Sequence, residues 1–203
     1  MAETSRRTRD EQRAQTKADL LAAAAQVFAR HGYHGTSVDM VAEAAGYTKG
    51  AVYSNFESKE ELFLALLDAR IEESLRSMQE VMDTAPPEER ADAFGRRRED
   101  IANWEPDWFL LEAEFELYAA RNPAVRERVA QRQEATRAVI EAALARHIDE
   151  LGLEPAYPVA DLAKLIVATG DGLGLMALNN PDVDTGDLMR VLLEVLARGA
   201  TAG

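Results

Sequence analysis

Apolar residues recur every three or four positions along most of this chain, and no credible stretch alternates apolar and polar residues as a half-buried strand would. Alanine, leucine, glutamate and arginine dominate these stretches, and prolines fall between them. The first four residue types favour helices, and proline interrupts them. The pattern therefore predicts an all-α protein.

Start and stop signals place two helices in the first 46 residues. A helix over about 13–31 is predicted to stop at Gly32. Thr36, with Asp39 three residues later, is close to a capping box and predicts the start of a second helix. That helix is predicted to end at Gly46 in a left-handed C-cap.

A short helix and a long one follow. Thr48 is positioned to cap a third helix within 48–56, and Ser58 with Glu61 forms a capping box for a fourth that reaches about Asp83. Five further helices are predicted at about 88–102, 105–120, 124–150, 158–179 and 186–198. The two functional regions are predicted as 1–57 and 58–203, joined by the long fourth helix.

The charge of the chain is unevenly distributed. The net charge is −13, yet residues 1–60 hold eight basic and eight acidic residues, so all of the excess negative charge follows residue 60. Such asymmetry suggests different partners for the two regions. The sequence contains no cysteine, which excludes disulfides and thiol catalysis. No apolar run is long enough to span a membrane, and a cytoplasmic location is expected.

The segment 48–56 is too polar to be a core helix, although it lies between two strongly apolar ones. Two helices joined by a short turn with glycine form a helix-turn-helix, whose second helix enters the major groove of DNA. Such a helix must be polar towards bases and phosphates, and it needs only a few apolar anchors, here Ala51, Val52 and Phe56. This geometry explains the composition of the segment.

The stretch GYHGTSVDMVAEAAGYTKGAVYSNFESKEELF (residues 32–63) resembles the DNA-binding signature of the TetR (tetracycline-repressor-like) family of bacterial transcriptional regulators. The resemblance implies an all-α homodimer. It implies an N-terminal three-helix helix-turn-helix domain and a C-terminal helical domain that binds a small-molecule effector and dimerises.

The resemblance also implies the residues that contact double-stranded DNA. They lie at the start of the second helix, on the recognition helix and at the start of the fourth helix: Thr36, Ser37, Thr48, Lys49, Gly50, Tyr53, Ser54, Asn55 and Lys59. We expect Tyr53 and Lys59 to bond phosphates, and Lys49 and Asn55 to read base edges. The alternatives are that Tyr53 covers the small core, that Lys59 is only a solvated charge, and that Ser54 has no role. Thr36 is expected to cap a helix in addition to any DNA contact.

The N-terminal arm contains Arg6, Arg7, Arg9 and Arg13. Basic arms of this kind reach into the minor groove in some DNA-binding proteins. The alternative is a flexible, solubilising tail, and the sequence does not decide between them.

An aromatic stripe and two apolar helices mark the second region. Trp104, Trp108, Leu111, Phe115 and Tyr118 are spaced by three or four residues on one helical face. Such a face is usually core, but the family places its effector pocket in this bundle, so we expect the stripe to line it. The effector itself is unknown.

The last two helices are apolar on more faces than a single core requires. By resemblance to the family they form a four-helix dimer interface. The residues expected there are Leu165, Thr169, Gly172, Leu173, Met176, Leu188, Leu192, Val195 and Leu196. The alternative is one buried monomer core.

These features predict a repressor that is released from a palindromic operator when an effector binds. A ligand-dependent activator and a protein-binding adaptor are the alternatives. His31, His34 and His147 match no metal motif and no catalytic triad, so neither an enzyme nor a metal or cofactor site is expected.

Overall fold

The computed structural model describes residues 8–94, 106–180 and 182–200. The regular secondary structure in these ranges consists of α-helices and a 3-10 turn, which confirms the predicted all-α class. The chain forms two compact units, Met1–Arg70 and Ile71–Gly203. The division falls inside one long helix, α4 (Lys59–Thr84). The functional boundary expected between residues 57 and 58 stays a prediction.

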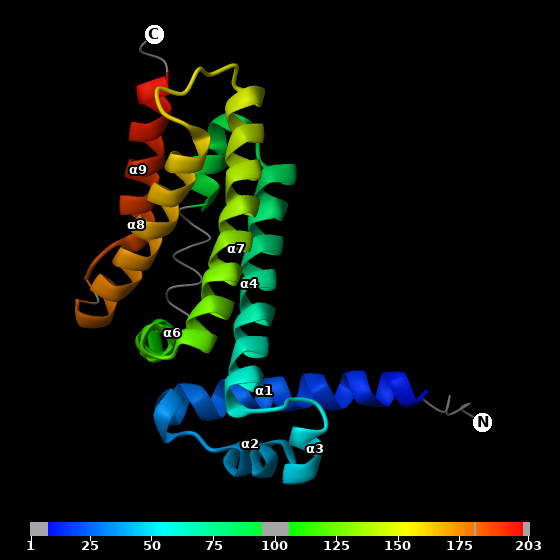
Figure 1. Cartoon of the computed structure of the whole chain (residues 1–203). Coiled ribbons are helices and arrows are strands. Elements are labelled where there is room, and N and C mark those ends of the chain that lie inside the picture. The colour runs from blue at the N-terminus through cyan, green and yellow to red at the C-terminus, as the bar shows by residue number, and fades with distance from the viewer. Residues whose placement is uncertain (1–7, 95–105, 181, 201–203) are drawn as a thin grey trace. The chain divides into compact units, whose positions relative to one another are not determined.

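The first unit contains α1 (Arg9–Gly35), α2 (Val38–Ala45), α3 (Lys49–Tyr53) and the beginning of α4. Figure 1 shows α1 lying across α2 and α3. Apolar side chains from all four helices make its core: Leu20, Ala24, Val27, Phe28, Tyr33, Val41, Val52, Leu62 and Phe63. The rings of Phe28, Tyr33 and Phe63 pack edge to face or stacked, which fixes the position of α4 against α1 within this unit.

Helix α1 starts four residues earlier than predicted. Thr8 and Glu11 form a complete capping box: Thr8 Oγ1 accepts from the Glu11 N–H at 3.2 Å, and the Glu11 carboxylate accepts from the Thr8 N–H at 2.7 Å. Arg9 and Arg13 of the expected arm are therefore helical, while Arg6 and Arg7 lie outside the described residues. The predicted break at Gly32 is confirmed, because its φ of 69° interrupts the helix before the Tyr33–Gly35 turn.

The second unit contains the end of α4, a 3-10 turn η1 (Pro87–Glu89), and helices α6 (Pro106–Arg121), α7 (Pro123–Glu150), α8 (Val159–Asn179) and α9 (Thr185–Ala200). Of the helix predicted at 88–102, residues 90–94 are helical and 95–102 lie outside the described residues. Helix α7 packs against α6 and α8, and α8 also packs against α9. None of the described helices is long and apolar enough to cross a membrane.

Close packing in this unit depends on a glycine. A methyl group at Gly174 of α8 would lie 2.6 Å from the ring of Phe109 on α6. Since real side chains do not approach so closely, only glycine lets these two helices pack as they do. The buried apolar side chains of this unit include Trp108, Leu111, Phe115, Val129, Leu162 and Leu173.

A group of charged side chains joins the end of α4 to the end of α7. The buried Arg90 donates to the Met82 carbonyl at 2.8 Å and to the Glu150 carboxylate. Arg146 bonds both Asp83 (2.8 Å) and Glu150 (2.7 Å). Met82 lies in the last turn of α4, so the bond from Arg90 satisfies a carbonyl that a helix end leaves without a partner.

Candidate nucleic-acid interface

Helix α3 is a short helix with one buried face and one exposed face. Thr48 caps it as predicted, since its hydroxyl accepts from the Ala51 N–H at 3.2 Å. The expected anchors Val52 and Phe56 are buried, and Ala51 is half-buried. The polar residues face solvent: Thr48, Lys49, Gly50, Tyr53 and Ser54. Tyr53 is 48% exposed, so its ring does not serve the core in this structure.

Lys49 is paired with a neighbouring helix. Its ammonium donates to the Asp39 carboxylate of α2 at 2.8 Å, and both side chains are more than half exposed. This hydrogen bond raises the pKa of Lys49 above its usual value. An exposed pair of this kind is worth little, so a phosphate or a base can replace Asp39 at small cost.

The start of α2 differs from the prediction. Ser37, not Thr36, is the N-cap: its hydroxyl accepts from the Met40 N–H at 3.3 Å. Thr36 is 3% exposed, and its hydroxyl donates to the carbonyls of Gly32 (2.8 Å) and Val27 (3.4 Å). The predicted Thr36 cap was therefore wrong. A hydroxyl held in this way does not point to solvent, so we leave Thr36 out of the proposed interface and retain Ser37.

Lys59, at the start of α4, ties elements of the first unit together. Its ammonium donates to the carbonyls of Tyr33 (2.9 Å) and Thr36 (3.1 Å) and lies 4.5 Å from the centre of the Tyr33 ring. Burial lowers the pKa of this lysine. Lys59 is more than the solvated charge considered from the sequence. Its third N–H is the one that a phosphate contact would use, and that contact stays a prediction.

Two further expected features lie close to Lys59 in the sequence. Ser58 Oγ accepts from the Glu61 N–H at 3.1 Å, as predicted, but the Glu61 carboxylate accepts from the Glu57 N–H, not from that of Ser58. Asn55 is half-buried, and its amide donates to the Ala51 carbonyl at 2.9 Å. An amide that is engaged with its own helix is poorly placed for the paired contact that reads adenine.

The aromatic stripe of the second unit is core in this structure. Trp108, Leu111 and Phe115 are buried and Tyr118 is half-buried, while Trp104 lies outside the described residues. The Phe115 and Tyr118 rings are 5.8 Å apart. The reading of this face as core is confirmed for those residues, and its role in an effector site stays a prediction. Among the described residues, no group of three or more histidine, aspartate and glutamate side chains could hold a metal ion.

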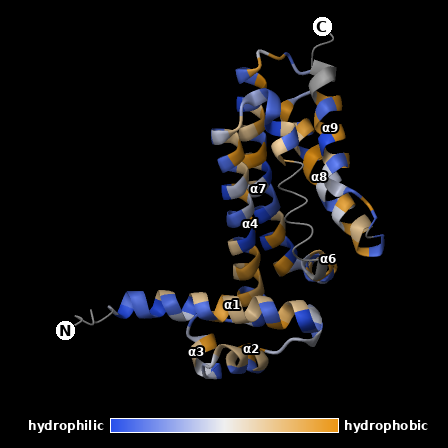
Figure 2. Ribbon diagram, turned by 180° about the vertical axis from the view of Figure 1, so that it is seen from behind, coloured by the Kyte–Doolittle hydropathy of each residue, from blue (hydrophilic) through white to orange (hydrophobic). Residues whose placement is uncertain are grey.

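Hydrophobic residues recur along α8 and α9, as the hydropathy colouring of Figure 2 shows. Several of their apolar side chains are exposed to solvent. Leu165 and Met176 on α8, and Leu188 and Val195 on α9, are each more than 40% exposed. Thr169, Leu192 and Leu196 are half-buried, and Gly172 is exposed. Leu173 is only 6% exposed and so belongs to the core of its own unit in this structure, and its contribution to an interface stays a prediction.

The first unit thus presents a helix-turn-helix: α2, a left-handed turn at Gly46, and α3 with its polar face exposed. In DNA-binding proteins this arrangement places the second helix in the major groove. The fold and the exposed residues therefore define a helix-turn-helix protein of the DNA-binding class.

Comparison with known proteins agrees. The sequence model of "Bacterial regulatory proteins, tetR family" matches residues 20–66. The chain is 28% identical over 157 residues to the transcriptional repressor AcnR of Corynebacterium efficiens, covering 77% of this chain and 79% of AcnR. It is 38% identical over 80 residues to the transcriptional activator FasR of Mycolicibacterium smegmatis, covering 39% of this chain and 35% of FasR.

The fold is shared with solved structures over nearly the whole chain. The transcriptional regulator FadR of Bacillus subtilis, solved with stearoyl-CoA, superimposes with a TM-score of 0.72 at 21% identity, covering 90% of this chain and 98% of FadR. The chain belongs to the TetR family and is a DNA-binding transcriptional regulator.

Proposed function

We propose that this protein is a homodimeric, cytoplasmic repressor that binds a palindromic operator and releases it when a small molecule binds the second unit. The observation that carries the proposal is the exposed polar face of α3, braced by Val52 and Phe56. AcnR, which resembles this chain over most of its length, is a repressor.

On the DNA side, each protomer would insert α3 into the major groove, and the dimer would hold two copies at half-site spacing. Tyr53 and Lys59 would bond phosphates, Lys49 would reach base edges, and Ser37 would contact the backbone from the start of α2. Thr48, Gly50 and Ser54 complete the surface that faces the groove.

On the effector side, the aromatic face of α6 supports an apolar ligand. Trp108, Leu111, Phe115 and Tyr118 pack in the core of the second unit, and a ligand that enters this core would meet apolar side chains with one hydroxyl group. Small-molecule sites favour this composition. FadR was solved with stearoyl-CoA, which makes an acyl-CoA a reasonable first probe. A ligand shifts the DNA-binding equilibrium only if it prefers one arrangement of the protein over the other.

Binding to the protein's own upstream DNA tests the proposal, with matched variants in the two units. Lys49→Met and Tyr53→Phe are expected to weaken binding about tenfold each, a loss of roughly 1.4 kcal/mol. Lys164→Met and Tyr157→Phe are the controls. Lys164 forms an equally exposed pair with Asp161 at 2.9 Å, and Tyr157 is an exposed tyrosine of the second unit.

The proposal is supported if the wild type and both control variants bind the DNA equally and both α3 variants bind it more weakly. No binding to the upstream region at any salt concentration, or equal binding by all five proteins, contradicts it. A reporter gene under the same promoter gives the sign of regulation: deletion of the regulator raises expression from a repressed promoter. Lowered expression favours the alternative of a ligand-dependent activator, as FasR is an activator.

A further inference from the structure

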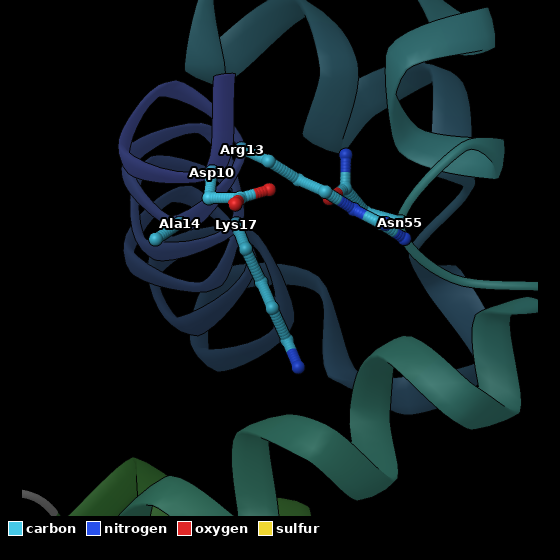
Figure 3. A pocket seen from close by; sticks show the side chains of 5 residues that line it. All are labelled: Asp10, Arg13, Ala14, Lys17 and Asn55. Carbon is cyan, nitrogen blue, oxygen red and sulfur yellow. The ribbon is translucent and has the colours of Figure 1, made fainter. Parts of the chain in front are cut away.

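A hollow on the first unit lies beside the helix-turn-helix and is lined mainly by α1. Its volume is about 350 Å³, and its lining residues are Asp10, Arg13, Ala14, Lys17 and Asn55. The four residues of α1 follow the spacing of three, one and three that puts them on one helical face. Figure 3 shows the Arg13 side chain extending from α1 towards Asn55, which comes just after α3.

The two cations of the hollow are available to a ligand. Arg13 and Lys17 are exposed, and neither takes part in an ion pair with any residue that the structure describes. By contrast, Arg137, Arg146 and Arg190 each bond two carboxylates. The Lys17 ammonium lies 5.8 Å from the centre of the Phe56 ring, in the turn that follows α3.

Asn55 links this hollow to the recognition helix. One N–H of its amide donates to the Ala51 carbonyl, and its distance of 3.4 Å to Ser54 Oγ is long for a second bond. The amide therefore keeps a donor for an anion in the hollow. Asn55 is two residues from Tyr53, which the proposed function places on a phosphate.

The charge of the hollow indicates which anion fits. Two cations and the Asp10 carboxylate give a net charge of +1, which balances the single charge of a phosphodiester. The small side chain of Ala14 lets the group approach the helix.

We propose that this hollow binds a phosphodiester group of the DNA backbone, held by Arg13 and Lys17 with a further bond from Asn55. The site rests on the proposed DNA-binding function and adds α1 to the interface. Arg13 and Lys17 both precede the segment that the family sequence model matches. The hollow gives Arg13 a role on the backbone that differs from the minor-groove arm considered from the sequence.

The test measures affinity for the upstream duplex as a function of salt concentration. Arg13→Gln/Lys17→Gln is expected to weaken binding roughly tenfold at low salt and to reduce the salt slope by about one per protomer, because one neutralised phosphate is lost in each. Arg30→Gln is the matched control, an exposed arginine of the same helix outside the hollow. It is expected to leave both quantities unchanged.

Two further measurements identify the phosphate itself. Asp10→Asn is expected to strengthen binding about twofold to threefold, because it removes a like charge beside the phosphate. Single phosphates of the duplex can also be ethylated. At one position or more in each half-site, ethylation is expected to weaken binding of the wild type but not that of the double variant.

The outcomes separate this site from the proposed function. If the wild type binds the duplex and the double variant keeps the affinity, salt slope and ethylation pattern of Arg30→Gln, the hollow is not a phosphate site, although the regulator still binds DNA. If the wild type does not bind, the proposed function itself fails. Equal losses in the double variant and in Arg30→Gln would show a general charge effect and overturn the site.

Discussion

Two neighbouring hydroxyl groups at the start of α2 have different roles because one is buried and the other is not. Ser37 lies at the surface and satisfies the Met40 N–H that the first turn leaves without a partner. Thr36 is enclosed, and its hydroxyl instead satisfies the carbonyls where α1 breaks at Gly32. A buried carbonyl without a donor costs more than an exposed one.

Thr36→Val is therefore expected to lower the free energy of unfolding by about 1–2 kcal/mol without changing DNA affinity, because shape is kept while the donor is lost. Urea unfolding and binding to the upstream duplex measure the two effects. Ser37→Ala is the matched variant, expected to cost about 1 kcal/mol by loss of the cap and also to weaken DNA binding. A Thr36→Val protein with unchanged stability and weakened binding would return Thr36 to the interface.

Among the helices, α3 shows how tertiary contacts replace intrinsic stability. A helix of five residues does not persist alone in water, since nucleation costs more than so few bonds return. Val52 and Phe56 anchor it in the core of the first unit, and Thr48 caps it. This leaves its outer face without any packing role, so polar residues there are free to contact DNA.

The end of α7 illustrates a titratable contact between elements. His147 Nδ1 lies 3.3 Å from Arg90 Nη1, next to the Glu150 carboxylate. Burial first, and then the positive charge of Arg90, lower the pKa of His147, and the opposing effect of Glu150 is smaller. The imidazole is therefore harder to protonate in the folded protein than in the unfolded chain.

This lowered pKa predicts a pH dependence of stability. As pH falls through the ordinary histidine pKa of about 6.5, the unfolded chain binds a proton at His147 before the folded protein does. The contribution of neutral His147 to the free energy of unfolding is therefore complete above that pH and decreases as pH falls to the lower pKa of the folded protein. Unfolding by urea at about pH 7.5, 6.5 and 5.5 is expected to show a decline in the wild type and a smaller one in His147→Gln. Parallel curves would contradict this role. The pKa values of Asp83 and Glu150 are also lowered, but these carboxyl groups change the stability of the protein only at more acidic pH.

At the scale of the whole molecule, α8 and α9 carry exposed apolar side chains of the kind that mark a protein–protein interface. A second copy of the chain is the partner that the proposed function supplies, and each helix offers a stripe along one face. The same exposure means that substitutions there leave the core of the protomer intact.

Met176→Glu/Val195→Glu is therefore expected to convert the proposed dimer to monomers at micromolar concentration, because four carboxylates would be buried without partners in one interface. The two side chains are 55% and 59% exposed. Sedimentation velocity measures the change, and circular dichroism checks that the helices remain. Leu117→Glu, at an equally exposed leucine of α6, is the control expected to stay dimeric. A monomeric wild type, or a dimeric double variant, would rule out this surface as the interface.

The sequence by itself determined the helical class, the glycine stops at Gly32 and Gly46, and the caps at Thr48 and Ser58. These features depend on backbone conformation and on neighbours within four residues, and such information is local. The spacing of Thr8 and Glu11 also matches a capping box and so marks the start of α1, four residues before the predicted one.

Only the tertiary structure decided which polar groups are free. Thr36 and Lys59 bond carbonyls up to 26 positions away in the chain. Lys49 of α3 pairs with Asp39 of α2, and Arg13 lines the same hollow as Asn55. Leu173 faces the core although it lies among residues of the exposed face. Side-chain burial and partners arise from packing between distant segments, which periodicity along one helix does not encode.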